Sequence, residues 1–144
     1  MSEPIDDFDA TDGTARPDRV SLGDYPKTMP TVRQRSLVDA CRRRALDLGL
    51  KLPRPIWWTF VHGQYDPHLH CAETRVSFDD LVFSRGVTVF VRADMSESDI
   101  IVAALHELKH CADSALVLTG RMDLVEAERR AVDFAWFARQ GWWR

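Results

Sequence analysis

Hydrophobic residues recur every three to four positions in three segments of the chain, which is the spacing of one face of an α-helix. The first segment lies between Thr31 and Gly49, and its apolar positions are Leu37, Cys41, Ala45 and Leu48. Thr31 and Gln34 have the spacing of a capping box, and Gly49 readily adopts the conformation that ends many helices. This pattern predicts a helix that starts after Pro30 and ends at Gly49.

Three segments in the middle of the chain are rich in β-branched and aromatic residues, which is typical of strands. They cover residues 55–61, 73–78 and 87–92. In the third segment an apolar side alternates with a mixed side that we expect to be partly exposed. The apolar side holds Val87, Val89 and Val91, and the mixed side holds Thr88, Phe90 and Arg92.

The last third of the chain has two further helical segments. One runs from about residue 99 to residue 118, after the N-cap candidates Ser96 and Ser98. The other starts at a second predicted capping box, Asp123 with Glu126, and extends to about residue 139. The order is therefore helix, three strands and two helices, which predicts an α+β fold with one three-stranded sheet.

Residues 1–30 differ in composition from the rest of the chain. They hold seven acids, three bases and few large apolar side chains, which predicts a flexible acidic tail before a domain of residues 31–144. The remaining 15 acids and 16 bases nearly cancel. The domain therefore has no net charge of the kind that favours nucleic acid.

The overall composition is that of a soluble globular protein, with 45% hydrophobic and 28% charged residues. The longest apolar run, residues 100–105, is far shorter than the roughly 20 residues that span a bilayer. The start of the chain has no basic and apolar leader. The three cysteines, Cys41, Cys71 and Cys111, have no Cys-x-x-Cys spacing and indicate reduced thiols. We expect a cytoplasmic protein without a membrane partner.

Residues 106–110 read His-Glu-Leu-Lys-His and lie in the predicted helix 99–118. Two histidines four positions apart lie one turn apart on the same helix face, so both imidazoles can bind one metal ion. Glu107 projects beside such an ion, where a carboxylate can take a proton from water. The motif predicts a Zn²⁺ site with His106 and His110 as ligands and Glu107 as the catalytic base.

Two imidazoles alone do not hold zinc firmly, so the site needs a third ligand. Our candidate is Glu128, because it falls on an apolar stripe of the last helix, where a carboxylate needs a counter-charge. The stripe consists of Leu124, Ala131, Val132 and Ala135. Glu126, on the polar face of that helix, is the alternative ligand. Asp113 is expected to accept a hydrogen bond from an imidazole ring instead.

These residues resemble the zincin metallopeptidases, in the branch that combines His-Glu-x-x-His with a glutamate on the following helix. ImmA/IrrE-type and related small bacterial or phage domains belong to that branch, and the resemblance covers roughly residues 31–139. It implies a minimal zincin-like fold and a peptidase that acts on a protein or peptide substrate. The family holds its substrate on an edge strand, and residues 87–92, with Val89 and Val91, are the expected strand. Val132 departs from the family, since larger relatives often have an acid there.

Two alternatives to a simple peptidase stay open. One is a zincin-shaped binding or assembly protein, associated with a phage or mobile element, that has little or no turnover. The other is a DNA-associated protease similar to the SprT-like group, whose phosphate contacts would come from Arg42, Arg43 and Arg44. The histidines and cysteine of residues 68–71 form a polar loop that offers further metal donors.

Overall fold

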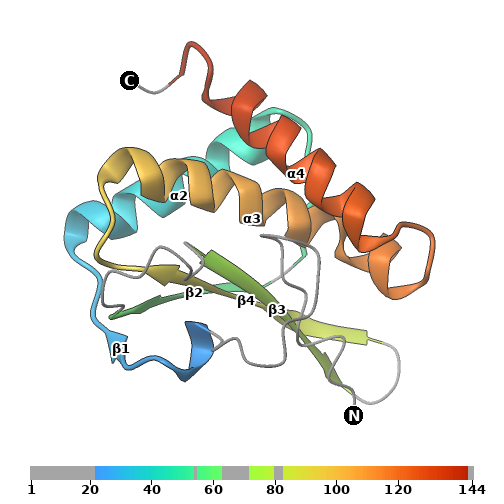
Figure 1. The fold of residues 1–144 in the computed structure, drawn as a ribbon, viewed down its shortest axis with the longest axis horizontal. Coiled ribbons are helices and arrows are strands. Elements are labelled where there is room, and N and C mark those ends of the chain that lie inside the picture. The colour runs from blue at the N-terminus through green and yellow to red at the C-terminus, as the bar shows by residue number, and fades with distance from the viewer. Residues whose placement is uncertain (1–21, 54, 63–71, 80–82, 143–144) are drawn as a thin grey trace.

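The computed structural model describes residues 22–53, 55–62, 72–79 and 83–142. Three helices lie on one face of a mixed β-sheet (Figure 1). The elements are η1 (Leu22–Asp24), β1 (Lys27–Thr28), α2 (Val32–Asp47), β2 (Ile56–Val61), β3 (Ala72–Asp79), β4 (Phe83–Arg92), α3 (Glu97–Leu118) and α4 (Leu124–Arg139). The expected α+β class is confirmed, with the predicted helices and strands in the predicted order.

The strand order in the sheet is β1-β2-β4-β3. β2 pairs with β4 in parallel, whereas β1 pairs antiparallel with β2 and β3 pairs antiparallel with β4. The expectation that Val89 and Val91 lie on an edge strand is therefore wrong. β4 lies between two strands, and both valines are 0% exposed because they face the helices. The long strand at the edge is β3.

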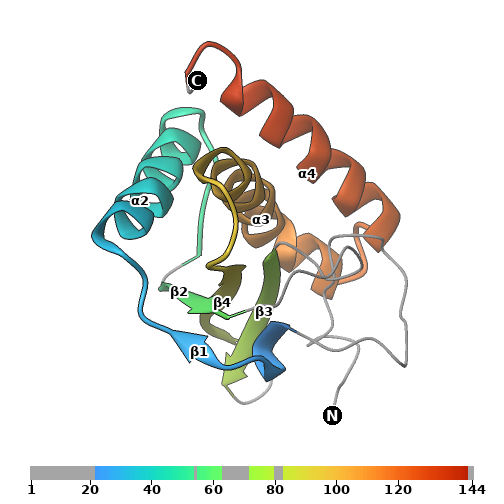
Figure 2. The ribbon, with the colours of Figure 1, turned by 60° about the vertical axis from the view of Figure 1, so that its left-hand side comes forward.

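The mixed side of β4 is more buried than we expected. Phe90 packs with Val61, Leu22 and the partly buried Tyr25 in a small second core. Arg92 is 5% exposed and forms an ion pair of 2.7 Å with Asp94. The η1 turn covers this side of the sheet, opposite to the helices (Figure 2).

Structure begins before Thr31, which is earlier than the sequence pattern indicated. Leu22 is 0% exposed, and Lys27 and Thr28 pair with the end of β2. A two-residue strand and a single buried leucine are too short to give a periodic signal, so this part of the expected tail was mispredicted. Residues 1–21 lie outside the described residues.

The helix starts follow the predicted capping chemistry. Thr31 Oγ1 accepts from the Gln34 amide, and Gln34 Oε1 accepts from the Thr31 amide, both at 3.0 Å. Ser96 caps α3, and Asp123 caps α4 through the amide of Glu126. The predicted second box is only half formed, because the Glu126 carboxylate binds arginines instead. Within the described residues, none of the helices combines the length and hydropathy needed to cross a bilayer.

Candidate metal centre

Helix α3 carries both histidines and lies in the middle of the helical layer, packed against α2, α4 and the strands β3 and β4. Its apolar face is fully buried, with Ile101, Leu105 and Leu108 at 0% exposure. His106 and His110 are one turn apart, and their ring centroids are 5.0 Å apart. The packing of α3 thus holds both rings at its boundary with α4.

Helix α4 brings the carboxylate to these rings. Its buried positions are all small: Ala127, Ala131, Ala135 and Ala138. A row of alanines lets two helix backbones approach closely. The expected stripe is confirmed at Ala131 and Ala135, whereas Val132 is 47% exposed. Glu128 lies beside this row with its side chain 21% exposed.

The three predicted donors converge on one point. Glu128 Oε1 is 3.1 Å from His106 Nε2 and 3.2 Å from His110 Nε2. All three donor atoms lie within 4.8 Å of one another, so the group is positioned to hold a metal ion. His110 is buried, while His106 and Glu128 keep part of their surface in solvent. The cluster is therefore accessible from one side.

The two imidazoles stabilise the ionised form of Glu128. Burial disfavours the carboxylate, but the hydrogen bonds with His106 and His110 outweigh it and keep the Glu128 pKa below its ordinary value. An ionised carboxylate and two imidazole nitrogens form a donor set of the kind that divalent transition metals bind.

Glu107 is not part of the donor cluster. It lies one position after His106 on α3, about 100° around the helix axis, and it is 2% exposed. Its predicted role as the catalytic base stays a prediction.

Asp113 and Glu126 have other partners than those expected. Asp113 is buried and accepts from Lys109, one turn earlier on the helix, at 3.2 Å. No hydrogen bond within the described part of the chain joins it to an imidazole. Glu126 points away from the cluster and binds Arg129 and Arg130, which together lower its pKa to about 2. Neither acid is therefore part of the donor cluster.

The three arginines predicted to contact phosphates, Arg42, Arg43 and Arg44, have intramolecular partners. Arg42 and Arg43 form ion pairs with Asp39. Arg44 donates to the carbonyl of Ala138 at 3.1 Å and stacks over Trp142. Their basic side chains therefore form contacts within α2 and between α2 and the C-terminal helix. Residues 68–71, which the sequence suggested as further metal donors, lie outside the described residues.

The chain has no match among known proteins: no family model, no curated protein and no solved structure matches it. The function of the site is therefore inferred from its geometry alone.

Proposed function

We propose that the protein is a zinc-dependent peptidase of the zincin type, in which His106, His110 and Glu128 bind the metal. The observation that carries this proposal is the single Glu128 oxygen within 3.2 Å of both histidine nitrogens. Tetrahedral zinc with donors about 2.0–2.1 Å away separates neighbouring donors by about 3.3 Å. The two spacings to Glu128 are close to this value, which suits zinc and other divalent transition metals of similar bond length.

The number of donors favours a catalytic site over a structural one. Structural zinc sites use four protein ligands, whereas catalytic sites use three and leave one position for water or substrate. The cluster contributes three donors from the described residues, and two of them are partly exposed to solvent. A partly open, three-donor site suits hydrolysis.

Glu107 supplies the proton transfers in this proposal. Bound zinc supplies a Lewis acid for the peptide carbonyl and lowers the pKa of the attacking water. Glu107 accepts the proton of that water on its carboxylate and passes it to the leaving amine nitrogen.

The edge of the sheet supports a peptide as the substrate. β3 is the long edge strand and packs beside α3, which carries the motif. An extended peptide can pair with such an edge, and it would then run past the histidines. β3 thus takes the role that the sequence assigned to Val89 and Val91.

The substitution Glu107→Gln tests catalysis apart from metal binding. We expect the zinc-loaded wild type to cleave members of a mixed peptide library, measured by mass spectrometry of the products. The Gln variant should keep its zinc, because residue 107 is not a donor, and lose activity about 10²–10⁴-fold. Equal cleavage by both forms would refute the role of Glu107. Zinc binding without cleavage by the wild type would favour the binding or assembly protein instead.

A further inference from the structure

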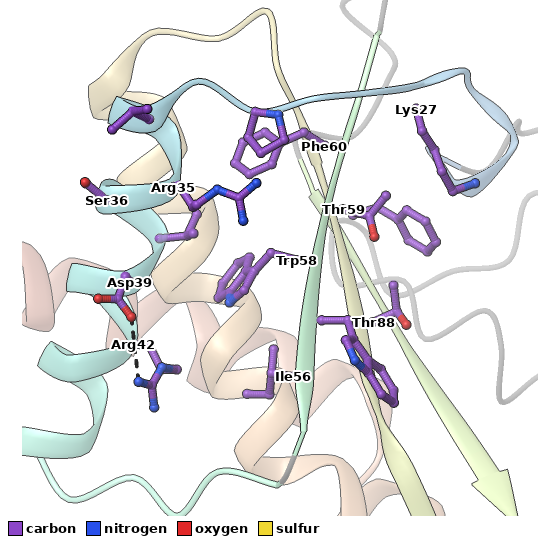
Figure 3. A pocket seen from close by; sticks show the side chains of 15 residues that line it. Lys27, Arg35, Ser36, Asp39, Arg42, Ile56, Trp58, Thr59, Phe60 and Thr88 are labelled. Carbon is purple, nitrogen blue, oxygen red and sulfur yellow. Dashed lines mark ion pairs between the residues drawn. The ribbon is translucent and has the colours of Figure 1, made fainter.

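A groove runs along the sheet edge opposite to β3, between β2 and α2 (Figure 3). Its volume is about 1040 Å³, and it is lined by β2, by one side of α2 and by the segment that joins β1 to α2. None of the metal donors lines it. The groove is therefore a second site, separate from the proposed active site.

β1 covers only the end of β2 on this side. It pairs with Phe60 and Val61, after which the chain turns at Pro30 into α2. Among the described residues, the stretch 56–59 of β2 has a neighbouring strand, β4, on the other side only. The groove lies at this uncovered stretch and is lined by residues from both faces of β2, which is expected for a space at a strand edge.

The backbone hydrogen bonds show which groups face the groove. The His62 amide donates toward the β1 side, to the Pro26 carbonyl, at 2.8 Å, whereas the Pro55 carbonyl accepts from β4 at 2.9 Å. Because successive residues of a strand point in opposite directions, the amides and carbonyls of Ile56 and Trp58 point toward the groove. Within the described segments, these amides and carbonyls have no hydrogen-bond partner on the groove side.

Two cations line the groove without an ionic partner among the described residues, Arg35 on α2 and Lys27 on β1. Arg35 extends from the helix toward β2 (Figure 3). The lining contains one acid, Asp39, which already pairs with arginines of its own helix. The groove is therefore positively charged.

The groove also offers apolar surface on both sides of the strand edge. Trp57 is 48% exposed and Val32 is 84% exposed, although both are large hydrophobic residues. Trp58 lies on the opposite face of β2, between the strand and α2 (Figure 3). Side chains of an added strand would alternate between these two faces.

We propose that this groove binds a partner protein through an extended acidic segment, which adds a strand to β2 beside the end of β1. Its backbone pairs with the free groups of Ile56 and Trp58, and its apolar side chains pack on the tryptophans. Its acids pair with Arg35 and Lys27. A second copy of this chain does not suit the groove, because two such edges would bring the same cations together.

A selection with random 12-residue displayed peptides tests the proposal on the full chain. We expect enrichment of peptides that alternate acidic with β-branched or aromatic residues. A synthetic, fluorescein-labelled copy of the most enriched peptide should bind K27E/R35E at least tenfold more weakly than the wild type. The matched control R121E changes an exposed arginine outside the groove and should bind as the wild type does.

Two further readouts separate strand addition from simple charge attraction. N-methylation of alternate peptide amides, in the register that faces β2, should abolish binding, since it removes the donors of the added strand. In NMR hydrogen exchange, the peptide should slow the amides of Ile56 and Trp58, and leave those of Trp57 and Thr59 unchanged because they face β4.

Several results would overturn the proposal. They are a selection without acidic enrichment, equal binding to K27E/R35E, and equal binding of the N-methylated peptide. If light scattering shows a dimer and R35E dissociates it, the edge of β2 binds a second copy of the chain instead. Cross-links from Lys27 to acids of residues 3–12 in a monomer would assign it to the same chain.

Discussion

The Glu128 carboxylate lies where two imidazole rings converge, so its loss should change the site more than the loss of any neighbouring acid. One of its oxygens faces both rings, whereas the carboxylates of Asp113 and Glu126 are held by Lys109 and by arginines of α4. The site thus depends on one acid among several nearby in sequence.

Substitution of Glu128 by Ala should weaken zinc binding about 100-fold or more. Loss of a residue that only hydrogen-bonds to a metal ligand already weakens metal binding about 10–100-fold. Competition with a chelating dye measures the dissociation constant. Glu126→Ala is the matched control on the same helix, and it should bind zinc as the wild type does, because Glu126 contacts only surface arginines. Equal affinities of the two variants would contradict the assignment of Glu128.

The Cys41 thiol should be unreactive in the folded protein. Burial raises its pKa to about 12, and its sulfur lies 3.8 Å from the carbonyl of Ile101. Only the thiolate reacts with iodoacetamide, so at pH 8 the native protein should stay unmodified at Cys41 while the urea-unfolded protein is alkylated. Peptide mapping by mass spectrometry measures this. Native alkylation as fast as in urea would show that Cys41 is not in the core.

The histidines of the donor cluster could be predicted from the sequence because helix geometry alone brings positions 106 and 110 to one face. The face of Glu128 on α4 followed from its apolar neighbours. The partners of Asp113 and Glu126 could not be predicted in the same way. Each of these acids has a competing cation three or four positions away, and side-chain conformation decides which partner is bound.

At the scale of elements, the site is made by the close packing of α4 on α3. Four alanines form the buried face of α4, and Ala131 lies less than one turn after Glu128. The separation between these helices therefore sets the distance between Glu128 and the histidines. A larger side chain in this row should move the carboxylate away from its partners.

The substitution Ala131→Leu should destabilise the protein by about 1–3 kcal/mol, because Ala131 is 0% exposed and the added atoms have no space. It should also weaken zinc binding, since it separates α3 from α4. Urea unfolding and dye competition measure the two effects. Val132→Leu, at an exposed neighbouring position, is the control and should change neither. Unchanged zinc affinity in Ala131→Leu would show that helix separation does not control the site.

The elements could be predicted, but their order in the sheet could not. Caps and periodicity are local signals, and they marked the helices and the long strands. β4 follows β3 in the chain, yet it lies between β2 and β3 and pairs with β2 in parallel. This strand order buries Val87, Val89 and Val91 under the helices. Such burial depends on contacts between segments that are distant in the chain, and the pattern of one strand does not determine them.

At the scale of the whole molecule, the two proposed sites lie in different parts of the fold. The metal cluster lies between the helices α3 and α4, and the basic groove lies at the edge of β2 under α2. They share no residue, so metal binding and strand addition should not depend on one another. The peptidase proposal therefore depends on the metal cluster and not on the groove.

Crystallographic anomalous scattering at the zinc absorption edge tests the central claim most directly, on crystals of the full chain grown with zinc. The account predicts one strong peak about 2.0–2.1 Å from His106 Nε2, His110 Nε2 and a Glu128 carboxylate oxygen. A peak bound elsewhere in the chain, or no peak at this cluster in the presence of zinc, would contradict it.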